Sequence, residues 1–502
     1  MWGVCCALST RGVAFCGNRY FFKETLMKYV IVGTGVAGIA AIEAIRSVDQ
    51  SGEITLIGND PHGYYSRPGL AYYLTGEIPD QALFSKKLED FQELRVRYLK
   101  GYVKRVLRDR KCLEVEGRKY VPYDRLLLAL GASAVPLEVP GSKLEGVLKL
   151  DCMGDANQIR KLATKGKTAI VVGGGITALE LVEGLVASGM KVLYLLRGGR
   201  YWSNVLDFQE SKIVEQRLKL EGVKLRYNSE IVEIIGKHNQ VNSILLKDGA
   251  CLKCDLLAYA IGVQPQTHLA KQSTLDVDHG ILVNEYMQTS DPNIFAAGDV
   301  AQVYDPRSKR SVIESLWAPA REQGTIAGLN MAGRKKAYVK SVPFNVTRLA
   351  GLTTTIIGAV GSGKDKDLVG IARGDSETWR QLPDTITAQT GFEVNRLRVM
   401  VGERILIGAV VMGDQTLSTP LVKMISNKVN ITTIRAALLT PNTDISDVIA
   451  NFWSNYTERG SSTQQNTIPR NSHPSLPISS LPQMDLQKTR PRDSVLHLRG
   501  VS

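Results

Sequence analysis

The chain has 502 residues, of which 44% are hydrophobic and 22% charged, a composition typical of a globular protein with more than one core. No apolar run in the sequence is long enough to cross a bilayer. The net charge of +13 comes partly from the two ends of the chain, and no block of lysine and arginine with interleaved aromatics marks a nucleic-acid site. A basic body therefore favours anionic cofactors or acidic partners, with nucleic acid as the alternative.

The two ends of the sequence are predicted to lie outside the fold. Residues 1–26 are basic and acid-poor but lack the apolar core of a secretion signal. We interpret them as an N-terminal extension, either an over-extended gene start or a weak transit peptide, since Met27 directly precedes the first predicted strand. Residues 455–502 are rich in Ser, Pro, Gln and Thr and are predicted to form a disordered tail.

The first glycine-rich segment is GTGVAG at 33–38, between a predicted buried strand at 28–32 and a predicted helix. In this pattern the first glycine makes the turn and the second lets the backbone approach a pyrophosphate. The third lets the helix pack on the strand. The helix start offers N–H groups and a positive dipole end to a phosphate. The segment predicts a dinucleotide site that uses Gly33, Gly35 and Gly38.

A second segment of the same kind, GGGITA at 173–178, follows a predicted strand at 168–172. Gly173, Gly175 and Ala178 take the three positions of the pattern. Strands alternate with helices around both segments, which predicts parallel sheets with ligands at the carboxyl ends of the strands. Two dinucleotide sites in one chain indicate that electrons pass from one cofactor to the other.

Together these motifs resemble the FAD- and NAD(P)-dependent pyridine nucleotide oxidoreductases, in particular the group of rubredoxin reductases, ferredoxin reductases and the flavin module of nitrite reductases. The resemblance covers about residues 27–452. It rests further on YSRPGL at 65–70, LLALGA at 127–132, TSDPNIFAAGDV at 289–300 and LWAPAREQG at 316–324.

The resemblance implies an α/β fold with two Rossmann-like dinucleotide-binding domains, for FAD and NAD(P), and a C-terminal α+β interface domain. We expect a homodimer through this last domain. The implied boundaries are a first part of the FAD-binding domain at 27–144, an NAD(P)-binding domain at 145–267, a second part of the FAD-binding domain at 268–341 and a C-terminal dimerisation-type domain at 342–454.

Residues for FAD are assigned from the resemblance. Arg67 and Pro68 are expected along the isoalloxazine ring. Gly298 and Asp299 are expected at the ribityl chain, where a carboxylate can accept a hydrogen bond from a hydroxyl. The second strand of the FAD unit ends without the usual acid, so the adenosine ribose is assigned to one or both of the next two polar residues, Asn59 and Asp60.

Three residues are predicted to be catalytic, namely Arg67, Glu180 and Trp317. Relatives place a glutamate at the position of Glu180 near the nicotinamide and the flavin, although a glutamate early in a helix also suits the helix dipole. Trp317 opens the helix expected under the flavin. It either stacks near the flavin or nicotinamide, or belongs to the buried core.

The second strand of the NAD(P) unit also lacks its acid, because Leu196 stands at that position. Arg197 and Arg200 follow it. An acid would bind a free ribose 2′-hydroxyl and repel a 2′-phosphate, so its absence beside two arginines permits NADPH as well as NADH.

Cysteine positions limit the redox chemistry. Disulfide-reducing relatives carry a redox cysteine in the segment that corresponds to 64–74, where this chain has none. We therefore expect no redox-active disulfide at the flavin, unless Cys152 folds in beside it. Cys251 and Cys254 form a CxxC without a second pair, which we interpret as structural thiols rather than a metal site. Cysteine usage fits a reducing compartment, so a cytoplasmic location is expected.

These features predict an FAD-dependent NAD(P)H oxidoreductase. Hydride passes from the nicotinamide to FAD, and electrons then leave for an external acceptor, expected to be a small redox protein of the rubredoxin or ferredoxin type. The main alternative is a flavin-bearing redox-sensing or scaffold protein of the apoptosis-inducing-factor-like type with little turnover. Nucleic-acid binding by the basic body is a further alternative.

Overall fold

The computed structural model describes residues 26–86, 88–306, 309–361, 386–391 and 395–464. The chain divides into two compact units, Met1–Ala450 and Asn451–Ser502. The extension at 1–25 and the chain beyond 464 lie outside the described residues. Among the described helices, none is long and apolar enough to cross a membrane.

The first core of the unit Met1–Ala450 is a five-stranded parallel sheet in the order β19-β7-β1-β2-β3. Its central strands are nearly fully buried, as expected for a parallel sheet covered on both faces. Strand β19 is far from the others in sequence, so the segment around it completes a sheet begun at the N-terminus. The strands are β1 (Lys28–Val32), β2 (Glu53–Gly58), β3 (Val96–Lys100), β7 (Arg125–Leu128) and β19 (Ile294–Ala296).

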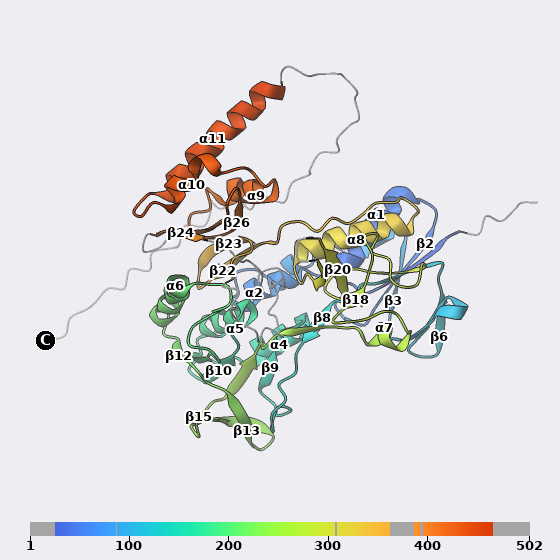
Figure 1. The fold of residues 1–502 in the computed structure, drawn as a ribbon. Helices are drawn as coiled ribbons and strands as arrows, with labels where there is room; N and C mark the ends of the chain where they lie inside the picture. The colour runs from blue at the N-terminus through green and yellow to red at the C-terminus, as the bar shows by residue number, and fades with distance from the viewer. Residues whose placement is uncertain (1–25, 87, 307–308, 362–385, 392–394, 465–502) are drawn as a thin grey trace, which may run out of the picture. The chain divides into compact units, whose positions relative to one another are not determined.

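Helices α1 (Val36–Val48) and α8 (Trp317–Met331) pack side by side against this sheet (Figure 1). Their backbones approach closely because α8 presents glycines to alanines of α1. A Cβ atom at Gly324 would lie 2.1 Å from the carbonyl oxygen of Ala37, and one at Gly328 would lie 2.4 Å from that of Ala41. The contact fixes α8, and with it the segment that follows β19, onto the N-terminal part of the chain.

A second parallel sheet has the order β12-β11-β10-β16-β9 and repeats the strand–helix pattern of the first. Both predicted glycine segments therefore stand between a parallel strand and a helix. The elements are β9 (Val147–Lys149), β10 (Thr168–Val172), β11 (Lys191–Leu195), β12 (Lys224–Arg226), β16 (Leu256–Tyr259), α4 (Met153–Leu162), α5 (Ile176–Ala187) and α6 (Phe208–Leu220).

Small sheets and short helices pack around the two cores. The pair β8–β17 joins the segments that run between them. The remaining strands are β4 (Val103–Leu107), β5 (Cys112–Val115), β6 (Lys119–Pro122), β8 (Ala132–Ala134), β13 (Ile231–Lys237), β14 (Gln240–Leu246), β15 (Cys251–Lys253), β17 (Val263–Pro265), β18 (Ile281–Leu282), β20 (Ala301–Asp305) and β21 (Arg310–Ile313). The short helices are η1 (Arg67–Gly69), α2 (Leu70–Leu74), η2 (Asp80–Leu83), α3 (Leu88–Glu93), η3 (Arg108–Arg110) and α7 (His268–Gln272).

The C-terminal region of this unit is an antiparallel sheet, in the order β22-β23-β26-β25-β24, with helices beside it. This is the predicted α+β domain, although its dimerisation role and the predicted domain boundaries stay predictions. The elements are β22 (Phe344–Leu349), β23 (Leu352–Gly358), β24 (Ile386–Gly391), β25 (Arg396–Val401), β26 (Leu406–Met412), α9 (Ser418–Ser426) and α10 (Thr432–Leu439).

The prediction of a disordered tail from 455 onward was wrong for residues 455–464. Helix α11 (Ile445–Gln464) continues through them. The ring of Tyr456 stacks on Phe452 at 6.1 Å and on Trp453 at 5.6 Å between centroids. Such pairs at spacings of three and four residues stabilise a helix, which composition alone does not reveal.

We expect Gly324→Ala to lower the free energy of unfolding by about 1–3 kcal/mol, since the new methyl group meets backbone rather than a movable side chain. Thermal unfolding followed by circular dichroism measures the change. Gly199→Ala is the matched control, because a Cβ atom there meets nothing within 4 Å. Equal midpoints for the two variants would contradict the close α1–α8 approach.

Candidate active site

A cavity of about 660 Å³ lies at the carboxyl ends of β1, β2 and β7, where α1 begins. Its wall also includes residues of α5, from the second glycine-rich unit, and of β22, from the C-terminal sheet. The volume is within the ordinary range for small-molecule sites. Parallel α/β sheets bind ligands at this edge, so the cavity lies where the sequence predicts a cofactor.

Ten of the predicted site residues line this cavity together. They are Gly33, Gly35, Asn59, Asp60, Arg67, Pro68, Glu180, Gly298, Asp299 and Trp317. Six others lie outside its wall, namely Gly38, Gly173, Gly175, Ala178, Arg197 and Arg200. Most of the first set was assigned to FAD and most of the second to NAD(P), and these assignments stay predictions.

The first glycine segment forms a cradle that side chains would fill. Gly33 has φ +120°, and a Cβ atom there would lie 2.0 Å from the carbonyl oxygen of Ala129. A Cβ atom at Gly38 would lie 2.2 Å from the carbonyl oxygen of Gly33, so this residue packs α1 on β1. Gly35 precedes α1, has no side chain to cap it, and is open on its Cβ side. The first N–H groups of α1 are thus suited to the pyrophosphate of a dinucleotide.

The turn that contains Gly298 and Asp299 is held by a buried polar chain. Gln323, which is fully buried, accepts a hydrogen bond from the Gly298 N–H at 2.9 Å. Its amide nitrogen lies 3.5 Å from Glu314, which also accepts from the Tyr338 hydroxyl at 2.7 Å. Sequence reasoning missed this support, because no local pattern links residues so far apart in the chain.

The YSRPGL segment is anchored on the other side of the cavity. Arg67 donates to the carbonyl oxygen of Asp151 at 3.2 Å, and its guanidinium lies 5.8 Å from the centroid of the Tyr65 ring. The Tyr65 hydroxyl donates to Asp60 at 3.1 Å and accepts from the Met153 N–H at 3.0 Å. Asp60 therefore has a structural partner as well as a place in the cavity wall.

Cys152 lies in the cavity wall. On the sequence alone, this placement was the one way in which a thiol could reach the site. Burial, the largest cause, raises the pKa of its thiol, with the nearby carboxyl of Asp155 acting in the same direction. The described lining contains no second cysteine. A single thiol that favours its protonated form lacks both the thiolate and the partner that dithiol exchange requires.

The other cysteine pair lies elsewhere. Cys251 is exposed on β15 and Cys254 is buried, where burial raises the pKa of its thiol to about 12. Within the ranges that the structure describes, no group of three or more His, Cys, Asp or Glu residues is arranged to hold a metal ion.

The far wall of the cavity is built by α5, α8 and β22. Trp317 is 42% exposed, so the interpretation as a buried core tryptophan was wrong. Arg348 forms two hydrogen bonds to the Glu77 carboxylate at 2.6 and 2.7 Å, and its guanidinium lies 5.0 Å from the centroid of the Tyr72 ring. Sequence reasoning did not identify Arg348, which brings a positive charge to this wall. Its partner Glu77 lies 271 residues earlier in the chain.

Glu183 is a second acid of this wall, one helical turn beyond Glu180 on α5. It accepts a hydrogen bond from the Gly351 N–H at 3.2 Å, in the β22–β23 turn. Burial is the main cause that raises its pKa to about 7; Glu180 and Glu221 act in the same direction and Arg348 opposes them. Its spacing from Glu180 could have indicated a shared face, but its burial depends on the C-terminal sheet.

The second glycine segment has the same construction as the first. A Cβ atom at Gly173 would lie 2.2 Å from the carbonyl oxygen of Ala260, and Gly175 precedes α5 without a side-chain cap. Ala178 is fully buried beside Gly173. The start of α5 is therefore also suited to a dinucleotide phosphate.

The two arginines after β11 differ. Arg197 is exposed. Arg200 donates to the carbonyl oxygens of Leu206 and of Ser203, the latter at 2.9 Å, and to the Ser211 hydroxyl at 3.1 Å. Arg200 thus holds its own loop, and its contact with a nicotinamide cofactor stays a prediction.

Comparison with known proteins identifies the wider group. Residues 27–324, more than half of the chain, match the family described as pyridine nucleotide-disulphide oxidoreductase. Nitrite reductase [NAD(P)H] of Bacillus subtilis (strain 168) is 28% identical over 82% of this chain and 49% of its own length, so the chain spans about half of that relative. Rubredoxin-NAD(+) reductase of Pseudomonas putida is 32% identical over 55% of this chain and 72% of its own length.

The fold matches solved structures as well. The covalent putidaredoxin reductase–putidaredoxin complex matches with a TM-score of 0.74 and 23% sequence identity, covering 85% of this chain and 98% of that chain. At this identity the match concerns the fold, which is α/β with two Rossmann-like domains.

Two glycine substitutions separate folding from cofactor binding. We expect Gly33→Ala to prevent folding, because its methyl group collides with backbone. We expect Gly35→Ala to fold but to bind FAD at least about tenfold more weakly, because its methyl group enters open space at the cradle. Flavin absorbance of the purified protein and FAD titration measure both, and Gly174→Ala in the other segment is the control. Unchanged FAD affinity in Gly35→Ala would contradict the cradle.

Glu183 predicts a pH dependence of stability. Because its pKa is raised in the folded chain from 4.5 to about 7, folding favours the protonated form, and stability is lost as the pH rises through this window. Glu183→Gln should therefore become more stable relative to the unaltered chain between pH 5 and pH 8, by up to about 3 kcal/mol. Unfolding midpoints across this range measure it, with the exposed Glu403→Gln as control, since Glu403 is not among the charges that shift the pKa of Glu183. A difference independent of pH would refute the assignment.

Proposed function

Because the chain belongs to the pyridine nucleotide-disulphide oxidoreductase family, we propose that it is an FAD-dependent NAD(P)H oxidoreductase that passes electrons to an external acceptor. The observation that carries the proposal is one cavity with walls from both dinucleotide units. Gly35 and Asp299 come from the first unit, and Glu180 comes from the helix that opens the second. A nicotinamide bound on α5 would thus face a flavin bound on α1.

The chain's own residues supply binding and orientation. The start of α1 would hold the pyrophosphate of FAD, and Asp299 would accept a hydrogen bond from its ribityl chain. Arg67 and Pro68 would position the ring. FAD, when bound, supplies the two-electron chemistry that accepts hydride from the nicotinamide and releases electrons to the acceptor. Glu180 would orient the nicotinamide from the other wall.

We infer that the acceptor is a small redox protein of the rubredoxin or ferredoxin type. A relative is named rubredoxin-NAD(+) reductase, and the matched structure is a complex with putidaredoxin. The net charge of +13 suits an acidic partner, since charge complementarity accelerates association. A homodimer through the C-terminal domain and a cytoplasmic location belong to the same proposal.

Stopped-flow reduction by NADH and by NADPH, followed by oxidation with a panel of acceptors, tests this function. We expect rapid bleaching of the flavin by at least one dinucleotide and rapid reoxidation by a small redox protein. Glu180→Gln should slow reduction about tenfold or more, and should leave flavin content unchanged. The exposed Glu221→Gln is the matched control.

Two results would overturn the proposal. A purified chain without flavin absorbance would exclude an FAD enzyme. Bound flavin that both dinucleotides reduce very slowly, without turnover on any acceptor, would favour the redox-sensing or scaffold alternative.

A further inference from the structure

The segment 197–206 follows β11, and we call it the nucleotide loop. We propose that Arg398, on β25 of the C-terminal sheet, is a positioning residue for this loop, so that the C-terminal domain sets the affinity for the nicotinamide dinucleotide. The inference rests on the proposed function, and it adds a specificity role for a domain otherwise expected only at an interface.

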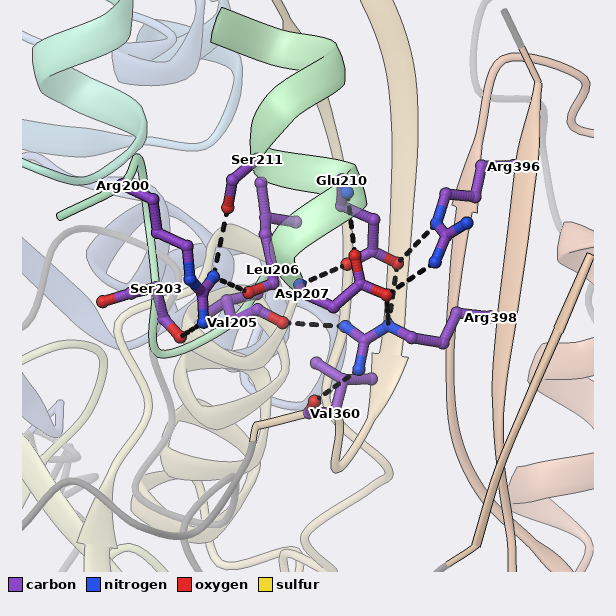
Figure 2. Close-up of polar contacts among 10 residues, drawn as sticks. All are labelled: Arg200, Ser203, Val205, Leu206, Asp207, Glu210, Ser211, Val360, Arg396 and Arg398. Atoms are coloured by element: carbon purple, nitrogen blue, oxygen red, sulfur yellow. Dashed lines mark hydrogen bonds and ion pairs between the residues drawn. The ribbon is translucent and has the colours of Figure 1, made fainter. Parts of the chain in front are cut away.

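Arg398 contacts the loop directly and from a buried position (Figure 2). The side chain belongs to a residue only 4% exposed. Its guanidinium donates to the Val205 carbonyl oxygen at 2.8 Å and to the Val360 carbonyl oxygen at 2.9 Å. Its third hydrogen bond is to the Glu210 carboxylate at 2.7 Å, at the start of α6, and its Nε also lies 3.7 Å from the Asp207 carboxylate. One planar group therefore joins the loop, the next helix and its own sheet.

The start of α6 is locked by the same cluster. Asp207 and Glu210 form a reciprocal capping box, with each carboxylate accepting from the other residue's N–H at 2.8 Å. Arg396, also on β25, donates to Asp207 at 2.7 Å. Burial is the largest influence on both acids. It raises the pKa of Glu210, whereas the pKa of Asp207 is lowered because backbone N–H and Arg396 contacts outweigh burial.

The conformation of the nucleotide loop is costly by itself. Trp202 has φ +46°, a left-handed conformation that is unfavourable for a bulky residue. The buried Tyr201 hydroxyl and Trp202 indole N–H have no hydrogen-bond partner among the described residues. Strain of this kind persists only where surrounding contacts hold it, and it gathers at functional sites. The Arg398 cluster is such a support.

The loop also carries both arginines that the sequence assigns to the nicotinamide dinucleotide, Arg197 and Arg200. Arg197 opens it two residues after β11 ends, next to the position where Rossmann folds bind the adenosine ribose. Arg200 ties the first half of the loop to the second through Ser203 and Leu206 (Figure 2). When the hydrogen bond from Arg398 to Val205 is lost, Val205 can shift. The contacts of Arg200 then carry this shift to the part of the loop that positions Arg197. This shift would weaken the binding of NADPH more than that of NADH, because only NADPH has a 2′-phosphate for Arg197 to contact.

The test uses the full FAD-loaded chain and compares Arg398→Lys with the unaltered protein. Lysine keeps the buried charge opposite Glu210 but cannot make the three contacts of a guanidinium. We expect the dissociation constant of NADP⁺ to rise about tenfold, that of NAD⁺ by a smaller factor, and kcat at saturating dinucleotide to stay within about twofold. The dissociation constants are measured by calorimetry. The kcat is measured with the acceptor that reoxidises the flavin fastest in the panel of acceptors. The exposed Arg404→Lys, in the same domain, is the matched control.

Two further variants keep the result interpretable. Glu210→Gln weakens the same contact from the other side, and it should also raise the dissociation constant of NADP⁺. It serves as the test if Arg398→Lys folds poorly. Arg197→Ala should lower the NADP⁺ preference, and combining it with Arg398→Lys should cause little further loss, because both act through one loop.

Binding and turnover distinguish the possible failures. A chain that binds neither NADP⁺ nor NAD⁺ refutes the proposed function itself. A chain that binds both, with Arg398→Lys and Glu210→Gln unchanged in either constant, refutes only the role of Arg398. A fall in thermal midpoint without any change in affinity assigns the cluster a purely structural role, and likewise overturns the inference.

Discussion

The close approach of α8 to α1 is the constraint on which the rest of the site depends. Gly324 and Gly328 allow two helix backbones to meet, and this contact holds β19 and the following turn against the N-terminal sheet. Because of the same approach, a Cβ atom at Gly298 would lie 3.2 Å from the Ala37 side chain. The glycine cradle at 33–38 and the turn with Asp299 thus become two sides of one cavity, although about 260 residues separate them in the chain.

Local chemistry explains how much of this the sequence predicted. A glycine turn between a strand and a helix is a property of a few adjacent residues, so both cradles and the α/β class could be predicted from their spacing. Glu183 and Arg348 were missed because their placement depends on contacts between distant elements. Trp317 was placed on the correct helix, but its exposure depends on what the neighbouring elements leave open. The helix through 455–464 was missed because the Ser, Pro, Gln and Thr content of 455–502 predicted disorder. The stacking of Phe452, Trp453 and Tyr456 was not considered.

Two clusters of buried charge hold together segments that are far apart in the sequence. Glu314, bonded to Tyr338 and paired with Lys340 at 3.3 Å, supports the turn at Gly298 through Gln323. Arg398 and Glu210 join the C-terminal sheet to α6. Taking such charges out of water costs several kcal/mol, and apolar residues of similar size are often as stable. Their value here is directional, since a guanidinium or carboxylate fixes an orientation that apolar contacts leave free.

The position of Cys152 decides how the redox chemistry of the cavity should be interpreted. A thiol in the wall takes part in disulfide chemistry only as a thiolate and with a second sulfur to pair with. Its raised pKa favours the protonated form, which is a poor nucleophile, and the described lining offers no second cysteine to complete a disulfide. The cavity wall also carries Trp317 and Val346, which are 42% and 53% exposed. An acceptor that reaches the cavity from outside therefore agrees better with this wall than an internal thiol does.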